Sequence, residues 1–249
     1  MDFDQFTLAA LFFLVAALYS SVGHAGASGY LAVMALLGFA PEQMRPTALA
    51  LNILVGGIGI FRFNKAGLVP WRKVIPFVLA SIPCAYFSAQ WHIPKQTYSL
   101  LLAGILLIAA AGAWRSGVLI EQSGDTLESK PVSIPLALLI GAIIGCLSGV
   151  TGTGGGIFLT PLLLYYCWAH SREASGLSVA FVWLNSLAAL IGLLHSQQTL
   201  PEALPIWLIA VALGALLGTQ LGIHRWPTHR LRKCLAIVLV IAAGKLLLG

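Results

Sequence analysis

Hydrophobic residues form ten runs along this chain, separated by short stretches that contain glycine, proline and charged residues. The runs cover about 4–22, 29–39, 46–63, 72–91, 97–114, 133–150, 156–168, 174–194, 203–223 and 231–248. A helix of about 20 apolar residues crosses roughly 30 Å of hydrocarbon. We therefore expect an all-α polytopic membrane protein with roughly 8–10 membrane segments, some of them too short to cross completely.

The composition supports a membrane location. Hydrophobic residues make up 59% of the chain and charged residues only 9%, against about 25% charged in soluble domains. The acidic start, MDFDQF, lacks the positive region of a signal peptide, so the first run is expected to be a retained helix. The four cysteines are scattered without a C-x-x-C pair. We expect no metal site, no disulfide and no cofactor.

The two halves of the chain repeat one pattern. Gly23, Gly26 and Gly29 recur at the spacing of Gly149, Gly152 and Gly155, and each triplet lies between a long apolar run and a short one. A polar loop follows in each half, PEQMRPT or AHSREAS, and then a run with one asparagine, Asn52 or Asn185. The sequence predicts a first membrane repeat (1–115), a polar linker (116–132) and a second membrane repeat (133–249). Such internal symmetry is typical of secondary transporters.

Lysine and arginine indicate how the halves are oriented. The loops FRFNKAGLVPWRK and HRWPTHRLRK are basic and should be cytoplasmic, whereas HSQQTLPEALP has neither residue type and should lie outside. This clustering is a topology signal, so we expect no nucleic-acid partner. The basic loop of the first half and the uncharged loop of the second half occupy equivalent places. The halves are therefore expected to be inverted repeats, with five crossings each, or three if the glycine-linked pair is re-entrant.

The glycine segments are the candidate binding site. An unwound stretch at membrane depth is tolerated only inside the protein or along a wet cavity, so 23–29 and 149–156 should meet in the bundle interior. The helices that start there present free N–H groups, which attract anions. The candidate substrate-binding residues are Gly23, His24, Gly26, Ser28, Gly29, Asn52, Ser148, Gly149, Thr151, Gly152, Thr153, Gly154, Gly155 and Asn185. Arg45 and Arg172, in similar short loops, are candidate vestibule residues.

Each candidate also has a simpler interpretation. Small residues allow helices to pack closely, and interfacial arginines need no functional role. The placement of the carboxylates favours a binding site, because none of the eight lies in the interior of an apolar run; Asp4 is at the very start of the first one. Cation-coupled transporters usually keep a carboxylate in the membrane. The substrate is therefore expected to be anionic or neutral, and His24 is the residue that could couple protons.

The segments GHAGASGYLAVMALLGFAPEQMRPTALALN and GCLSGVTGTGGGIFLTPLLLY resemble the sulfite exporter TauE/SafE family of membrane transporters. The resemblance covers essentially the whole chain, although Ala25, Ala27 and Ser28 replace some of the glycines of the second motif. It implies a multi-pass protein of the bacterial inner membrane that moves small sulfur-containing anions such as sulfite or sulfonates. The expected mechanism is export by alternating access, without enzymatic activity. The expected partners are the small anion and the lipid bilayer, and the sequence leaves a homo-oligomer open.

Two other functions stay open at this point. GASG at 26–29 is similar to the serine motif of rhomboid proteases, which would make Ser28 the nucleophile of an intramembrane hydrolase, with His24 or His195 as the base. The second half has Gly154 where Ser28 would align, so this alternative leaves the duplication unexplained. A receptor or scaffold without transport activity is the remaining alternative.

Overall fold

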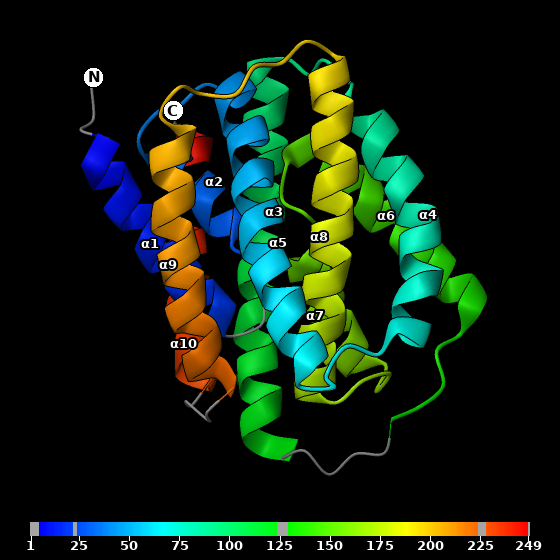
Figure 1. The fold of residues 1–249 in the computed structure, drawn as a ribbon. Coiled ribbons are helices and arrows are strands. Elements are labelled where there is room, and N and C mark those ends of the chain that lie inside the picture. Colours follow the sequence, from blue (N-terminus) through cyan, green and yellow to red (C-terminus); the bar gives the residue numbers. More distant parts are fainter. Residues whose placement is uncertain (1–4, 22–23, 124–128, 224–227, 249) are drawn as a thin grey trace.

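The computed structural model describes residues 5–21, 24–123, 129–223 and 228–248, and these form ten helices with no strand among them (Figure 1). They are α1 (Gln5–Ser21), α2 (Ala27–Leu36), α3 (Pro41–Lys65), α4 (Trp71–Ala89), α5 (Lys95–Ser123), α6 (Ile134–Thr151), α7 (Gly156–Tyr165), α8 (Ser171–His195), α9 (Leu204–Ile223) and α10 (Thr228–Leu248). Each predicted run is confirmed as one helix. The all-α fold class is therefore confirmed.

Within the part of the chain that the structure describes, four helices are long and apolar enough to cross a membrane: α3, the part Lys95–Arg115 of α5, α6, and the part Arg172–His195 of α8. The helices α2 and α7 have ten residues each. At 1.5 Å per residue they reach about 15 Å, half of the hydrocarbon thickness. They are therefore half-helices, and both begin inside the bundle at a glycine in the left-handed conformation, Gly26 or Gly155.

Helix packing follows the repeat in the sequence. The helix α4 packs along α6, and the equivalent helices α9 and α1 also pack along one another. The half-helix α2 lies against α10, and α7 lies against α5. Figure 1 shows that α3 and α8 run in opposite directions, with the α3–α4 loop at the lower end and the α8–α9 loop at the upper end. Inverted repeats require this arrangement, and the inverted relation itself stays a prediction.

Glycine rows bring the helices into backbone contact. On α6, a Cβ at Gly141 would lie 2.2 Å from the carbonyl oxygen of Phe77, and one at Gly145 would lie 2.4 Å from that of Ser81. On α9, Gly214 and Gly218 approach main-chain carbonyls of α1 in the same way. Close approach of this kind is how small residues hold membrane helices together. The row continues to Gly149, in the last turn of α6, and the second glycine turn begins just after it, at Gly152.

Candidate functional site

The second glycine turn, residues 152–155, links α6 to α7 within the bundle. Gly152, Gly154 and Gly155 have φ angles of +79°, +72° and +82°. This left-handed region is accessible to glycine but strained for other residues. All four residues of the turn are buried. The chain therefore reverses in the protein interior, and the N-terminus of α7 lies there.

Side chains from α3, α6 and α8 enclose this turn. A Cβ on Gly154 would lie 2.5 Å from Asn52 Nδ2 and 3.0 Å from Ser186 Oγ. A Cβ on Gly155 would lie 2.6 Å from Ile144 Cγ2 and 3.6 Å from Ser148 Cβ. Asn52 Nδ2 also donates to Ser186 Oγ at 3.3 Å. The backbone of the turn is thus exposed to polar groups of neighbouring helices, with no room for a side chain of its own.

Several polar atoms near this turn have no hydrogen-bond partner among the described residues. They include Asn52 Oδ1 and Ser148 Oγ, both in fully buried side chains. Asn185 Oδ1, on α8, is also unpartnered, while its Nδ2 donates to the carbonyl of Phe181 at 3.1 Å. Buried polar atoms are nearly always paired, so each unpaired atom requires an explanation. An anion next to the α7 N-terminus would supply an acceptor for the Ser148 hydroxyl, whereas the two amide oxygens need a donor.

The two threonines of the motif bond mainly within their own segment. Thr151 Oγ1 donates to the Leu147 carbonyl at 2.6 Å and lies 3.1 Å from Thr153 Oγ1. Gly149 packs against α4, since a Cβ there would lie 2.2 Å from Ser88 Oγ. Gly149 therefore belongs to the helix contact, whereas Gly152, Gly154 and Gly155 form the turn.

The first motif is built differently. Gly23 lies outside the described residues. Gly26 has a φ of +101° and precedes α2. Gly29 packs α2 against α1, because a Cβ there would lie 2.6 Å from Val15 Cγ1. Ser28 Oγ donates to Tyr19 Oη at 2.9 Å. Side chains of α1 thus contact this motif, so the two motifs are not equivalent in their surroundings.

His24 joins the first motif to the second half of the chain. Its Nε2 lies 3.2 Å from Thr160 Oγ1, on the half-helix α7. The Thr160 hydroxyl also lies 2.6 Å from Ser178 Oγ and 3.2 Å from the Gly156 carbonyl oxygen. The first glycine segment therefore meets the helix that the second turn begins, inside the bundle.

The hydrolase alternative needs a serine and a histidine in hydrogen-bond contact. Ser28 donates to Tyr19, and His24 pairs with Thr160. His195 lies at the end of α8, where its ring centroid is 6.4 Å from that of Tyr86. The described hydrogen bonds therefore do not connect Ser28 to either candidate base.

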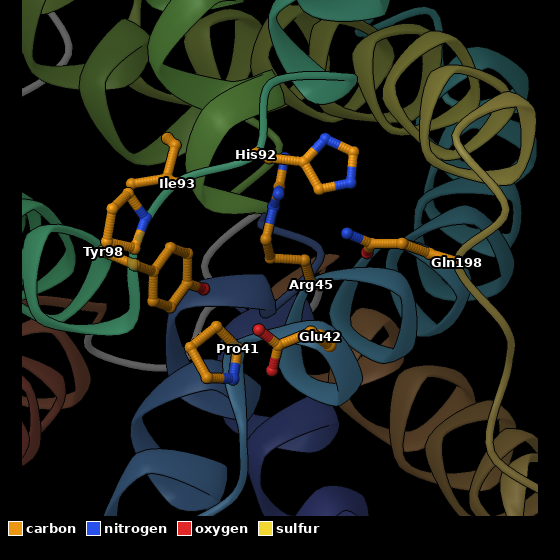
Figure 2. A pocket seen from close by; sticks show the side chains of 8 residues that line it. Pro41, Glu42, Arg45, His92, Ile93, Tyr98 and Gln198 are labelled. Carbon is orange, nitrogen blue, oxygen red and sulfur yellow. The ribbon is translucent and has the colours of Figure 1, made fainter.

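Arg45 lines a pocket of about 300 Å³ at one end of the bundle, here named the Arg45 pocket (Figure 2). Glu42, His92, Tyr98 and Gln198 also line it. The Arg45 side chain is only 3% exposed. Its Nη2 donates to the carbonyls of Ala89 at 2.7 Å and Gly149 at 3.0 Å. This predicted vestibule residue is therefore in direct contact with the end of α6.

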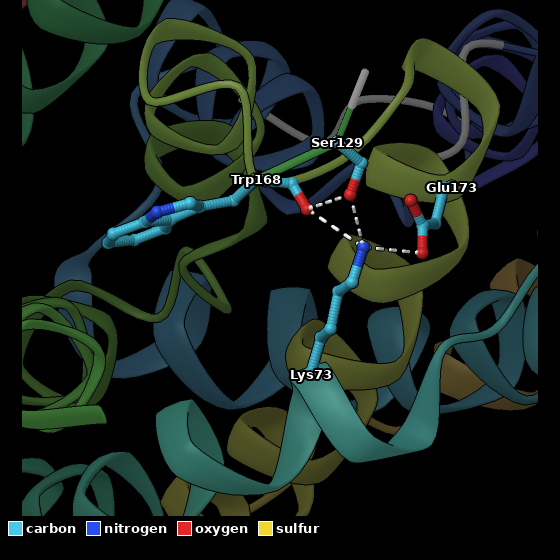
Figure 3. A network of polar contacts seen from close by, with 4 residues as sticks. All are labelled: Lys73, Ser129, Trp168 and Glu173. Atoms are coloured by element: carbon cyan, nitrogen blue, oxygen red, sulfur yellow. Dashed lines mark hydrogen bonds and ion pairs between the residues drawn. The ribbon is translucent and has the colours of Figure 1, made fainter. Parts of the chain in front are cut away.

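Arg172 lines a second pocket, of about 570 Å³, next to the loop that follows α3. Arg172 is exposed, unlike Arg45. Lys73, Ser129 and Glu173 line the same pocket and form a polar network with the Trp168 carbonyl (Figure 3). Because α3 begins at the Arg45 pocket and ends at this one, the two arginines mark opposite ends of the bundle.

Sequence reasoning missed the hydroxyl groups of Thr160, Ser178 and Ser186. A signal for the last two was present. Ser178, Asn185 and Ser186 are seven and eight residues apart on α8 and so share one helix face. That polar face points toward α3 and α7.

The sequence profile of the family "Sulfite exporter TauE/SafE" matches residues 8–246. A "Probable membrane transporter protein y4hK" from Sinorhizobium fredii is 40% identical, over 99% of this chain and all of the relative. A "Probable membrane transporter protein MJ0441" from Methanocaldococcus jannaschii is 30% identical, over 69% of this chain and 67% of the relative. The "Probable membrane transporter protein MamO" from Magnetospirillum gryphiswaldense is 24% identical, over 86% of this chain but only 40% of its own length.

No solved structure matches the chain at a significant level. The relatives bear the names of membrane transporters, and the helices include four apolar segments of spanning length. The protein is therefore a multi-pass membrane protein, which in bacteria resides in the inner membrane. The chain belongs to the sulfite exporter TauE/SafE family of membrane transporters.

Proposed function

We propose that the protein exports a small sulfur-containing oxyanion, such as sulfite or a sulfonate, by alternating access. The anion would bind at the second glycine turn, next to the N-terminus of α7. The observation that carries the proposal is the unpartnered Ser148 Oγ, in a fully buried side chain that borders this turn. A hydroxyl can turn its hydrogen toward an anion, and the Asn52 amide can present its N–H₂ group when it is rotated so that its Oδ1 accepts from Ser186.

The distribution of charge supports an anionic substrate. Among the residues whose burial the structure describes, Arg45 is the only buried charged residue. The carboxylates of Glu42, Glu173 and Glu202 are not buried. A site for a free cation would be expected to place a carboxylate in the interior. Backbone N–H groups, hydroxyls and one guanidinium are instead the groups that bind oxyanions.

The membrane potential favours export of an anion. Moving one negative charge outward across a membrane that is negative inside yields about 2.3 kcal/mol per 100 mV. Export therefore needs no coupling ion. The packing of equivalent helices and the opposite directions of α3 and α8 support halves that rock against each other.

The test compares Ser148→Ala with Ser81→Ala in proteoliposomes that contain radiolabelled sulfite under an imposed potential. Both serines are fully buried and have an unpartnered Oγ, but only Ser148 borders the glycine turn. Loss of a hydrogen bond to an anion should raise the KM for sulfite about tenfold in Ser148→Ala. Ser81→Ala should transport like the wild type. Both variants should fold, because each loses an unsatisfied hydroxyl.

The outcomes separate the substrate from the site. Equal KM values for the two variants would overturn the site and leave the transporter. If the wild type fails to transport sulfite but transports a sulfonate, the assignment to sulfur-containing oxyanions is kept and sulfite is not the substrate. If it transports neither, the sulfur-anion assignment is wrong.

A further inference from the structure

Arg45 is held by the ends of two helices. The carbonyl groups that it binds belong to Ala89, the last residue of α4, and to Gly149, in the last turn of α6. Its Nη1 also reaches the carbonyl of Trp91 at 3.5 Å. Helix C-termini carry partial negative charge, so these contacts stabilise the guanidinium where it lies. Gly152 allows the approach, since a Cβ there would lie 3.1 Å from Arg45 Cα.

These contacts do not use all the donors of Arg45. A guanidinium has five N–H groups in a planar fork. Nη2 donates to two carbonyls and Nη1 reaches one, whereas Nε is buried and has no partner among the described residues. Both hydrogens of Nη2 are committed to carbonyls, so the Nε–H is a single free donor that can bind one oxygen of an oxyanion. A buried donor without a partner carries a cost that a bound anion would remove.

The Arg45 pocket places further polar side chains next to Arg45. Figure 2 shows the side chains of Glu42 and Gln198 directed toward the space beside Arg45. Gln198 Oε1 is a second buried polar atom without a described partner. Tyr98, which lines the pocket, donates to the Thr151 carbonyl at 3.0 Å. Two pocket residues, Tyr98 and Arg45, thus bind the main chain that leads into the glycine turn.

We propose that the Arg45 pocket is a second oxyanion subsite, at the end of the transport path opposite the loop between α3 and α4, and that the Nε–H of Arg45 donates to the anion there. The subsite deepens the proposed function, on which it rests, because it would receive the exported anion from the glycine turn. Gln198, on the α8–α9 loop, can donate its amide N–H groups to the same anion.

Glu42 makes the subsite testable without disturbing Arg45. Its carboxylate lines the pocket and is exposed, and it opposes an anion bound beside Arg45. Glu42→Gln should therefore tighten sulfite binding about threefold, the size expected for one charge in a largely solvated pocket. Glu202→Gln is the matched control, because Glu202 is also exposed and lies at the same end, on the loop that carries Gln198, but does not line the pocket.

The measurement is titration calorimetry of sodium sulfite into purified protein in detergent. A lower Kd for Glu42→Gln, with Glu202→Gln unchanged, is the expected result. Arg45→Lys keeps the charge and can still donate to the carbonyls, but it lacks the Nε–H, so sulfite should bind about tenfold more weakly.

Equal Kd values for Glu42→Gln and Glu202→Gln would overturn the subsite, as would the absence of any sulfite binding. Transport separates this proposal from the previous one. If wild-type proteoliposomes transport sulfite and the two glutamine variants bind it equally, only the subsite is wrong. If Glu42→Gln tightens binding but the wild type transports no anion, the subsite stands and the transport function is wrong.

Discussion

Lys73 Nζ lies 2.9 Å from Glu173 Oε1, and this ion pair joins α4 of the first half to α8 of the second half (Figure 3). Lys73 also donates to Ser129 Oγ at 2.8 Å and to the Trp168 carbonyl at 2.9 Å. One ammonium group therefore holds the end of the linker, the α7–α8 loop and the start of α8 together. At the other end of the bundle, Arg45 connects α3 to α6. Each end thus contains a cation that contacts both halves.

Glu173→Gln should loosen the end of the bundle that contains the Arg172 pocket. The pair is about a quarter exposed, so its loss should cost only about 1 kcal/mol, which is about fivefold in an equilibrium between closed and open forms. A cysteine placed at Leu68, which lines this pocket, should react about fivefold faster with a membrane-impermeant maleimide. The measurement needs a background without the native cysteines.

Glu202→Gln is the control, because it removes one negative charge without touching the ion pair. Glu202 lies on the loop after α8, whereas Glu173 lies in the first turn of α8. The double variant with Lys73→Glu and Glu173→Lys should restore the slow reaction, because it rebuilds the pair in reverse. An unchanged reaction rate in Glu173→Gln would contradict a closing role for this pair.

Thr160→Val should uncouple the first glycine motif from α7. The Thr160 hydroxyl contacts His24, Ser178 and the Gly156 carbonyl, whereas the Thr47 hydroxyl donates only within its own helix, to the Gln43 carbonyl. Valine keeps the shape of threonine. Thr160→Val should lower stability by about 1–3 kcal/mol, because it leaves buried partners unpaired, while Thr47→Val should be nearly neutral. Thermal unfolding in detergent measures both, and equal effects would show that the link between the halves adds no stability.

The sequence predicted the helices well because a membrane imposes a simple rule. Every backbone group must be paired, so an apolar run becomes a helix and a glycine cluster marks the break. The breaks at Gly26 and Gly155 were therefore foreseeable. The polar linker and the repeat boundaries stay predictions, since side chains within 116–128 lie outside the description.

The site was less predictable, because one glycine can serve a turn or a helix contact. Gly149 and Gly29 match their motifs in spacing but pack against α4 and α1. For Gly149 a signal was present: Gly141, Gly145 and Gly149 recur every four residues, which indicates one packed helix face. The burial of Arg45 left no signal in the sequence. Its expected place was a short loop, whereas the structure places it near the start of α3, where contacts with the ends of α4 and α6 bury it.

The glycine row on α6 gives a prediction about stability. Gly145→Ala would place a Cβ 2.4 Å from the Ser81 carbonyl oxygen. A main-chain oxygen cannot rotate away as a side chain can, so α4 and α6 must separate, at a cost of about 2 kcal/mol or more. Gly104→Ala is the control: it also lies within a helix, but no atom comes within 4 Å of its Cβ. That change should be neutral or stabilise the protein by up to about 1 kcal/mol, because alanine favours helix. The unfolding temperatures in one detergent should therefore move in opposite directions, and a loss in both variants would mean that the α4–α6 contact is not what makes Gly145 necessary.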